Sequence, residues 1–455
     1  MNASRQIDRH QQQSQLQQLE EQGTYAFFNI LTGPQLFDSV ERLLPENHRE
    51  RLFPPTETLS MFLTQTVSPD RSCQNAVNRS AVARHRNRLK PCSTSTSGFC
   101  RARERLPLAL VQELSIECAR EVSDTVPTDW RFRGRPVRLV DGATIALPDT
   151  PENQAQYPQP SSQESGLGFP QCRLVGLFCL ASGALLDCET GPCVGKGSDE
   201  QTGLRAQLDV LEQGDILIGD AFYATYFLLA ELGRRKVDAI FEQNGARKRK
   251  TDFRRGRRLG CNDHVIELKK PTLRPDWMSE QEYREAPESI KIRECRVGGK
   301  VLTTTFLCAR DMPKSTLKAL YRERWNVELD FRNLKTTMGM DMMSCKTPEM
   351  VIKEIWVYFL AYNIIRLLMS QAAAQYGLLP RQISFKHTIQ VWLAWKDYPE
   401  AGDPADLFML IAQRRVGNRP GRVEPRAMKR RPKPFPWLKE HRQAARDRIR
   451  QYGHP

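Results

Sequence analysis

The spacing of hydrophobic residues changes near residue 130 of the chain. From Thr24 to about Asp124, apolar residues recur three or four positions apart without strand-like alternation, which predicts a group of helices. Beyond residue 130, short apolar runs bounded by Gly, Pro and Asp predict strands instead. The pattern therefore predicts a small helical region followed by a larger region of mixed α and β structure.

The region from 131 to 243 predicts three strands, a helix, a strand, a helix and a strand, in that order. This order indicates an α/β fold with a mixed sheet, in which parallel strands are added to an antiparallel meander. The expected strands fall in 131–149, 172–191 (a hairpin that turns at Ser182–Gly183), 215–220 and 237–243, and the expected helices in 203–213 and 225–236.

Residues 244–313 interrupt this order. They are basic, then polar, and end in the alternating stretch GGKVLTTTFLC, which predicts an inserted β-rich domain. Long helices resume at about Lys314 and continue to about Gln375. The apolar run 355–369 is too short to cross a bilayer comfortably and contains Arg366, so we expect a buried helix there.

We therefore expect six segments along the chain. They are a disordered Gln-rich N-terminus (1–23), a helical domain (24–128), the first part of the α/β core (129–243), the β-rich insertion (244–313), a second, helical part of the core (314–400) and a basic tail (401–455).

The net charge of +15 is concentrated in two runs. Between 414 and 450 there are 14 Lys and Arg against 3 acids, a net charge of +11, and 246–258 holds 8 basic residues against Asp252. Either run alone also fits a solvated loop, but two together favour a polyanionic partner such as DNA. The helical segment 93–122 adds exposed arginines, although an ordinary helical bundle explains these equally well. The candidate DNA-contacting residues are Arg101, Arg103, Arg247, Lys248, Arg254, Arg255, Arg430 and Arg431.

Cysteine usage and the N-terminus indicate a cytoplasmic protein. The twelve cysteines are scattered and form no CxxC pair, which is more typical of reduced thiols than of a zinc site. The N-terminal stretch QQQSQLQQLEEQ contains no apolar signal region, and we expect no membrane partner.

Four polar residues recur at helical spacing inside the segment YRERWNVELDFRNLK. Tyr321, Arg324, Glu328 and Lys335 are separated by three, four and seven positions, which places them on one face of a helix, within an arc of roughly 60°. Large apolar residues border this row, so the charges require partners. A solvated stripe of ion pairs is the alternative, but a metal together with DNA phosphate would also supply those partners.

Two further acids follow predicted strands. Asp141 comes after the apolar run Val137–Val140, and Asp220 stands at the end of DILIGD. Ligands gather beyond the carboxyl ends of strands in α/β sheets, although either acid alone is more often a turn former or a helix cap. Sequence spacing cannot show that they meet Glu328, because this requires the fold.

If the three acids converge, their chemistry is constrained. Carboxylate oxygens with open positions suit two Mg²⁺ ions, with Mn²⁺ as a substitute, and do not suit zinc. Two such ions about 4 Å apart activate a water or a 3′-hydroxyl for in-line phosphoryl transfer. Arg324, Lys335 and Tyr321 would then contact the DNA backbone.

The spacing Tyr321-x2-Arg324-x3-Glu328-x6-Lys335 resembles in full the Y-R-E-K signature of DDE transposases of bacterial insertion sequences of the IS-four type. The segments 139–159 and 214–226 resemble those that hold the family's first and second catalytic Asp, and 418–438 resembles a stretch common in this group. The resemblance assigns the catalytic and metal-binding roles to Asp141, Asp220 and Glu328.

The resemblance implies an RNase H-like core with a β-rich insertion between the second Asp and the Glu. It also implies double-stranded DNA partners, namely the inverted-repeat ends and the target, a homodimer that pairs the ends, and metal-dependent cleavage and strand transfer. Some relatives hold a flipped base with an aromatic residue of the insertion. This chain has TTTFL where they have tryptophan, so Trp277 and Phe306 are candidates that also fit packing roles.

Two other functions fit the same residues. A nuclease of this fold would use the same acids and metals without strand transfer, and a non-catalytic, domesticated copy would bind DNA only. The presence of all three acids and of the complete Y-R-E-K set argues against the second alternative.

Overall fold

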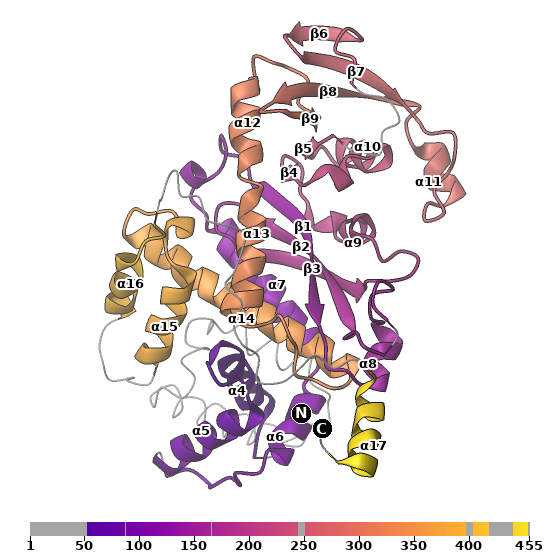
Figure 1. Ribbon diagram of the computed structural model, residues 1–455. Helices are drawn as coiled ribbons and strands as arrows, with labels where there is room; N and C mark the ends of the chain where they lie inside the picture. Colours follow the sequence, from indigo (N-terminus) through magenta and orange to yellow (C-terminus); the bar gives the residue numbers. More distant parts are fainter. Residues whose placement is uncertain are drawn as a thin grey trace, which may run out of the picture.

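One nine-stranded mixed sheet runs through the protein (Figure 1). The computed structural model describes residues 52–86, 88–164, 166–243, 251–396, 404–417 and 440–453. The strand order is β3-β2-β1-β4-β5-β9-β8-β7-β6. The strands are β1 (Val137–Ala146), β2 (Gln171–Cys179), β3 (Leu185–Pro192), β4 (Ile216–Ile218), β5 (Asp238–Glu242), β6 (Arg257–Gly260), β7 (Asp263–Lys269), β8 (Ser289–Val297) and β9 (Lys300–Thr304).

The predicted order of strands and helices in the core is confirmed, apart from a short helix, α8 (Pro151–Gln156), that lies between the first two strands and was not predicted. β1, β2 and β3 form the antiparallel meander, and β4 and β5 add to β1 as parallel strands. The helix between β3 and β4, α9 (Glu200–Ala206), is shorter than expected. It begins earlier than predicted because Asp199 caps it. A 3-10 turn at Leu208–Val210 takes the place of its predicted C-terminal part. α10 (Tyr226–Arg234) connects β4 to β5. This arrangement agrees with the RNase H-like core that we expected.

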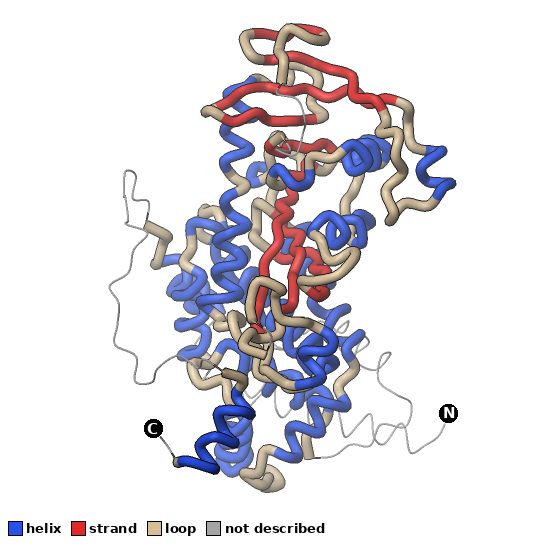
Figure 2. The backbone as a smooth tube through the Cα atoms, turned by 45° about the vertical axis from the view of Figure 1, so that its right-hand side comes forward, coloured by secondary structure: helices blue, strands red, loops and turns tan. Residues whose placement is uncertain are grey.

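The β-rich insertion extends the central sheet. β9 pairs with β5 in antiparallel register, with Ile240 opposite Thr304, and β8, β7 and β6 follow as antiparallel neighbours. A short helix, α11 (Glu280–Glu285), connects β7 to β8. Figure 2 shows these strands at the end of the molecule opposite the N-terminal helices. The insertion is therefore built onto the edge of the core.

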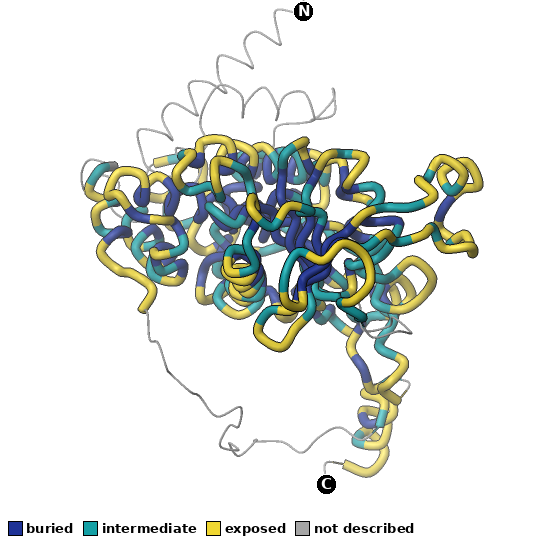
Figure 3. Tube along the Cα trace, turned by 90° about the horizontal axis from the view of Figure 1, so that it is seen from above, coloured by how far each residue is buried: buried dark blue, intermediate teal, exposed yellow. Residues whose placement is uncertain are grey.

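Helices of the N-terminal region pack beside the second part of the core. The expectation of a helical region is confirmed for its described part, which holds α4 (Pro55–Val67), α5 (Cys73–Arg86), α6 (Ser97–Arg105) and α7 (Leu108–Asp124). α7 lies along α14 (Pro348–Gln375). As expected from its apolar run, α14 is buried along most of its length. Figure 3 shows that buried backbone fills the interior of the molecule and that exposed backbone surrounds it. Among the described helices, none has the length and apolar character needed to cross a membrane.

Further helices complete the described part of the chain. They are α8 (Pro151–Gln156), α12 (Lys314–Arg322), α13 (Trp325–Arg332), a π-helical turn (Asn333–Thr337), α15 (Phe385–Trp395), α16 (Pro404–Gln413) and α17 (Arg442–Tyr452). All twelve cysteines are free thiols.

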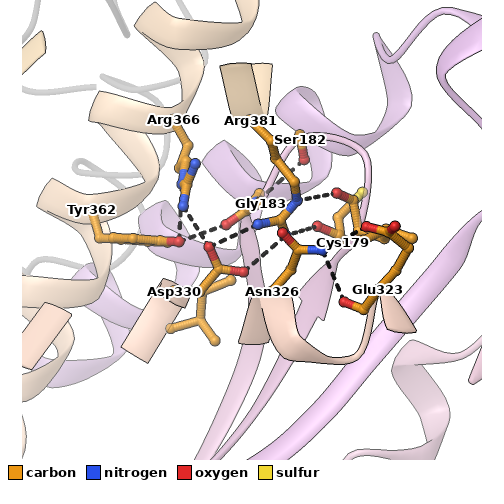
Figure 4. Close-up of polar contacts among 12 residues, drawn as sticks. Cys179, Ser182, Gly183, Glu323, Asn326, Asp330, Tyr362, Arg366 and Arg381 are labelled. Atoms are coloured by element: carbon orange, nitrogen blue, oxygen red, sulfur yellow. Dashed lines mark hydrogen bonds and ion pairs between the residues drawn. The ribbon is translucent and has the colours of Figure 1, made fainter. Parts of the chain in front are cut away.

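A buried ion network holds α13 against the core (Figure 4). The carboxylate of Asp330, on α13, is fully buried and accepts from Arg366 of α14 at 2.5 Å and from Arg381 at 2.8 Å. Arg381 also donates to the carbonyl of Cys179 at the end of β2, and Arg366 to the hydroxyl of Tyr362. Arg366, the charged residue inside the apolar run of α14, thus has a specific partner in Asp330, as a buried charge requires.

Replacing Asp330 with Ala should destabilise the protein strongly. The substitution leaves two arginines buried without their acid, which costs about 3–5 kcal/mol. Chemical denaturation followed by circular dichroism measures the loss. Asp209→Ala removes an exposed partner of Arg235 and should change stability by less than about 1 kcal/mol. Equal effects of the two substitutions would contradict a central role for the network.

Candidate active site

The register of the two central parallel strands places Asp141 and Asp220 side by side. β1 and β4 pair in parallel up to Leu139 opposite Ile218, and each acid stands two residues further along its own segment. Asp220 keeps an extended backbone, with φ −80° and ψ −169°. Residues at matching positions of neighbouring strands point to the same face and lie about 5 Å apart. The charge of Asp220 acts on Asp141, consistent with this placement.

Arg324 connects the third acid to the first. Its Nη1 atom lies 3.5 Å from Oδ2 of Asp141, and its Nη2 atom donates to Oε1 of Glu328 at 3.0 Å. Glu328 lies in the first turn of α13, which is held against the core through Asp330. The fold thus brings an acid from a strand and an acid from a distant helix to one guanidinium group.

Burial dominates the electrostatics of Asp141 and raises its pKa to about 6. The backbone N–H of Gly142 and the charge of Arg324 oppose this rise, whereas the negative charges of Glu200 and Asp220 add to it. Burial also raises the pKa of Glu200. Acidic charge therefore exceeds its compensation at this site, which is the environment that a bound cation would stabilise.

Sequence reasoning missed Glu200. It stands in the first turn of α9, where acids commonly stabilise a helix by interaction with its dipole. Nothing in the local sequence separates that ordinary role from a place near Asp141 and Asp220. Only the packing of α9 against β1 and β2 brings Glu200 there.

The four signature residues do not share one regular α-helix, so the expected straight row is wrong. α12 ends at Arg322 and α13 begins at Trp325, and a tighter turn between them contains a hydrogen bond from the N–H of Arg324 to the carbonyl of Tyr321. A π-helical turn then carries Lys335. The turn and the π-helical segment both depart from 3.6 residues per turn, so the side chains diverge.

Their contacts diverge accordingly. Tyr321 is largely buried, and its hydroxyl lies 3.5 Å from Oε2 of Glu242 at the end of β5. Lys335 lies 3.8 Å from Asp341. Of the three non-acidic signature residues, Arg324 is the one that forms ion pairs with Asp141 and Glu328 among the described contacts.

The donor chemistry fits a hard divalent cation, but the side chains are not assembled around one. Within the described ranges, no three His, Cys, Asp or Glu side chains are close enough together to hold a metal ion. Arg324 accounts for this in part, because its guanidinium engages both Asp141 and Glu328. Carboxylate oxygens are the ligands that Mg²⁺ and Mn²⁺ prefer.

The candidate DNA-contacting arginines have different environments. Arg101, Arg254 and Arg255 are exposed. Arg103 is buried, with its guanidinium 3.9 Å from the ring centre of Phe62, so the expectation that it is exposed was wrong. A helical surface pattern could not reveal that α14 and its preceding loop cover this side of α6. Arg247, Lys248, Arg430 and Arg431 lie outside the described residues.

Both aromatic candidates of the insertion make packing contacts. Trp277 is half-exposed; its ring lies 3.9 Å from the guanidinium of Arg205 and stands edge-on to Phe227. Phe306 packs against the core. These contacts give each ring a structural role.

Substituting Asn for Asp141 should change how stability depends on pH in metal-free protein. The unfolded chain releases this proton near pH 4 and the folded protein near pH 6, so the folded state binds more protons between these values. Stability should therefore fall as pH rises through this window, by on the order of 3 kcal/mol in total, and Asp141→Asn should remove that decrease.

Urea denaturation in EDTA at pH 4 to 8 measures this dependence. Asp129→Asn, at an exposed acid, is the control. If the Asp141 and Asp129 variants both keep the profile of the wild type, burial of Asp141 does not destabilise its charged form.

Comparison with known proteins finds transposases among the similar ones. The protein is 27% identical over 359 residues to the transposase InsG for insertion sequence element IS4 of Escherichia coli (strain K12), with 75% of this chain and 78% of that protein covered. A cryo-EM structure of the piggyBac transposase synaptic complex with hairpin DNA matches with a TM-score of 0.45 and 10% identity, over 88% of this chain and 87% of that one.

The family model described as "Transposase DDE domain" matches residues 132–364, from the start of the core sheet into α14. That span is just over half of the 455 residues. The chain therefore belongs to the DDE transposase family, enzymes that depend on divalent metal and move DNA by cleavage and strand transfer.

Proposed function

We propose that Asp141, Asp220 and Glu328 hold the divalent ions of this transposase, and that these ions are Mg²⁺, with Mn²⁺ as a substitute. The observation that carries the proposal is the contact of one guanidinium, that of Arg324, with both Asp141 and Glu328, beside the strand position of Asp220. The guanidinium of Arg324 thus lies among carboxylates that would otherwise repel one another. A hard divalent ion would neutralise these carboxylates more strongly than the guanidinium does.

Bound ions supply a Lewis acid for the scissile phosphate and a nucleophile from water or a 3′-hydroxyl at neutral pH. The chain's own residues prepare this site. Burial of Asp141 keeps water from screening its charge, and the N–H of Gly142 holds one carboxylate oxygen at 2.9 Å. With ions bound, Glu328 would serve as a metal ligand, and the guanidinium of Arg324 would then be available to a phosphate.

Arg324, Lys335 and Tyr321 contact the DNA backbone in this proposal. Arg324 offers a planar fork that suits two phosphate oxygens, and Lys335 offers a point charge. Tyr321 is mostly buried, so its contribution is limited to its hydroxyl, beside Glu242. The pair of Lys335 with Asp341 is partly exposed and weak enough to exchange for a phosphate.

Double-stranded DNA is held by basic side chains outside the catalytic centre. We assign this role to Arg101, Arg254 and Arg255, which are exposed, and, from sequence alone, to Arg247, Lys248, Arg430 and Arg431. Arg103 is not included, because it is buried. The substrates are the inverted-repeat ends of the element and a target, paired by a homodimer on bacterial DNA in the cytoplasm.

Glu328→Gln should abolish cleavage without preventing end binding. The amide cannot supply a charged ligand, and loss of several kcal/mol of transition-state stabilisation corresponds to a rate lower by about 1,000-fold or more. Labelled end DNA with Mg²⁺ measures cleavage, and a mobility shift measures binding. Glu323→Gln changes a nearby acid that contacts Asn326, and should cleave normally. Cleavage at the wild-type rate by the Glu328 variant would refute its assigned role.

The double substitution Arg254→Ala, Arg255→Ala should weaken binding of all DNA sequences to a similar extent. Loss of two phosphate contacts should reduce the slope of log affinity against log salt concentration by about 2. Fluorescence anisotropy at 50 to 300 mM salt measures the slope. Asp252→Asn removes the acid beside both arginines and should not weaken binding. An unchanged slope in the double variant would place these arginines away from DNA.

A further inference from the structure

The carboxylate of Glu200 lies against the residue that follows the first catalytic acid. A Cβ atom placed on Gly142 would come within 2.2 Å of its Oε1 atom, so the approach depends on glycine at that position. The N–H of the same Gly142 donates to Oδ1 of Asp141. A single residue of β1 therefore contacts both carboxylates.

Glu200 reaches the site from the side of the sheet opposite α13. Successive residues of a strand face opposite sides, and Asp141 faces Arg324 while Gly142 faces α9. Figures 1 and 2 show α9 and α13 on either side of the central strands. Glu200 thus adds a negative charge that the sequence motif does not contain and that comes from the other layer of the fold.

Two residues hold the Glu200 carboxylate in place. Nη1 of Arg173, on β2, lies 3.5 Å from Oε1, and the hydroxyl of Tyr223 lies 3.5 Å from Oε2. Tyr223 is fully buried three residues after Asp220 and packs beneath Gly219. The same short segment therefore carries the second catalytic acid and fixes Glu200.

We propose that Glu200 is a positioning residue of the metal centre, a fourth carboxylate whose charge acts through Asp141 and Asp220 to raise the affinity for divalent ions. This inference rests on the metal ligands proposed above. In the ion pairs described for the four acids of the site, the only cations are Arg173 and Arg324. Their mutual repulsion is present before metal binds and is relieved when it binds, so each added acid makes binding more favourable.

A purely structural role for Glu200 makes a different prediction. If its carboxylate served only α9 and Tyr223, its neutral amide would destabilise the fold and leave metal affinity unchanged. An electrostatic role reverses both effects, because removal of one repelling charge stabilises the metal-free protein or leaves its stability unaltered, and weakens metal binding.

Mn²⁺ binding by the metal-free, full-length protein separates these roles, with free Mn²⁺ quantified by electron paramagnetic resonance. Glu200→Gln should bind Mn²⁺ about 10- to 100-fold more weakly, the range typical of residues that act behind metal ligands. Its melting temperature in EDTA should equal or exceed that of the wild type. Glu200→Asp, which keeps the charge, should recover part of the affinity. Asp187→Asn, at another half-buried acid of this sheet, should have no effect on affinity.

Arg173→Met provides a second, opposite test that leaves Glu200 in place. It removes the cation beside Glu200, so Mn²⁺ affinity should increase. Unchanged affinity in Glu200→Gln, or weaker binding in Arg173→Met, would overturn the role of Glu200. Asp141→Asn should abolish binding in either case; if it does not, the proposed ligands themselves are wrong, which distinguishes the two failures.

Discussion

The position of the catalytic helix depends on one buried acid. Asp330 lies two residues after Glu328 and binds arginines from α14 and from the segment that follows it. Because charges in the interior are tolerated only with well-placed partners, this network ties α13 to α14 and to the end of β2. The long apolar α14 supplies burial but little directional information, since hydrophobic contact is non-directional. Asp330 therefore specifies where Glu328 enters the site.

The candidate site around Asp141 combines an excess of acidic side chains with one cation of the protein, Arg324. Burial raises the pKa of Asp141 because the surroundings stabilise its charge poorly. Arg324 offsets part of that cost through Asp141 and Glu328. In the proposed function, a divalent metal and a phosphate would bring charges of opposite sign to this site. The strongly basic remainder of the chain supplies the attraction for DNA that an acidic centre alone would oppose.

Local patterns predicted elements well and side-chain surroundings less well. The meander and the parallel strands were predicted because each strand has its own apolar run, and the order of runs limits the possible topologies. Arg103 was misjudged because burial depends on what packs over a helix, and here Cys345, more than 200 residues away, lies over it. The signature segment was misjudged because an irregular turn follows Tyr321 and a π-helical turn contains Lys335, and regular periodicity cannot anticipate a change of pitch.

The sequence by itself determined the order of strands and helices and the family, and it singled out three acids as candidate metal ligands, because these features reside in local spacing and residue type. Only the tertiary structure decided which groups meet. The register of β1 on β4 places Asp141 beside Asp220, and the Asp330 network brings Glu328 to them. Packing of α9 adds Glu200, which no motif marks. Contacts between residues distant along the chain depend on register, helix pitch and burial, which are properties of the packed fold.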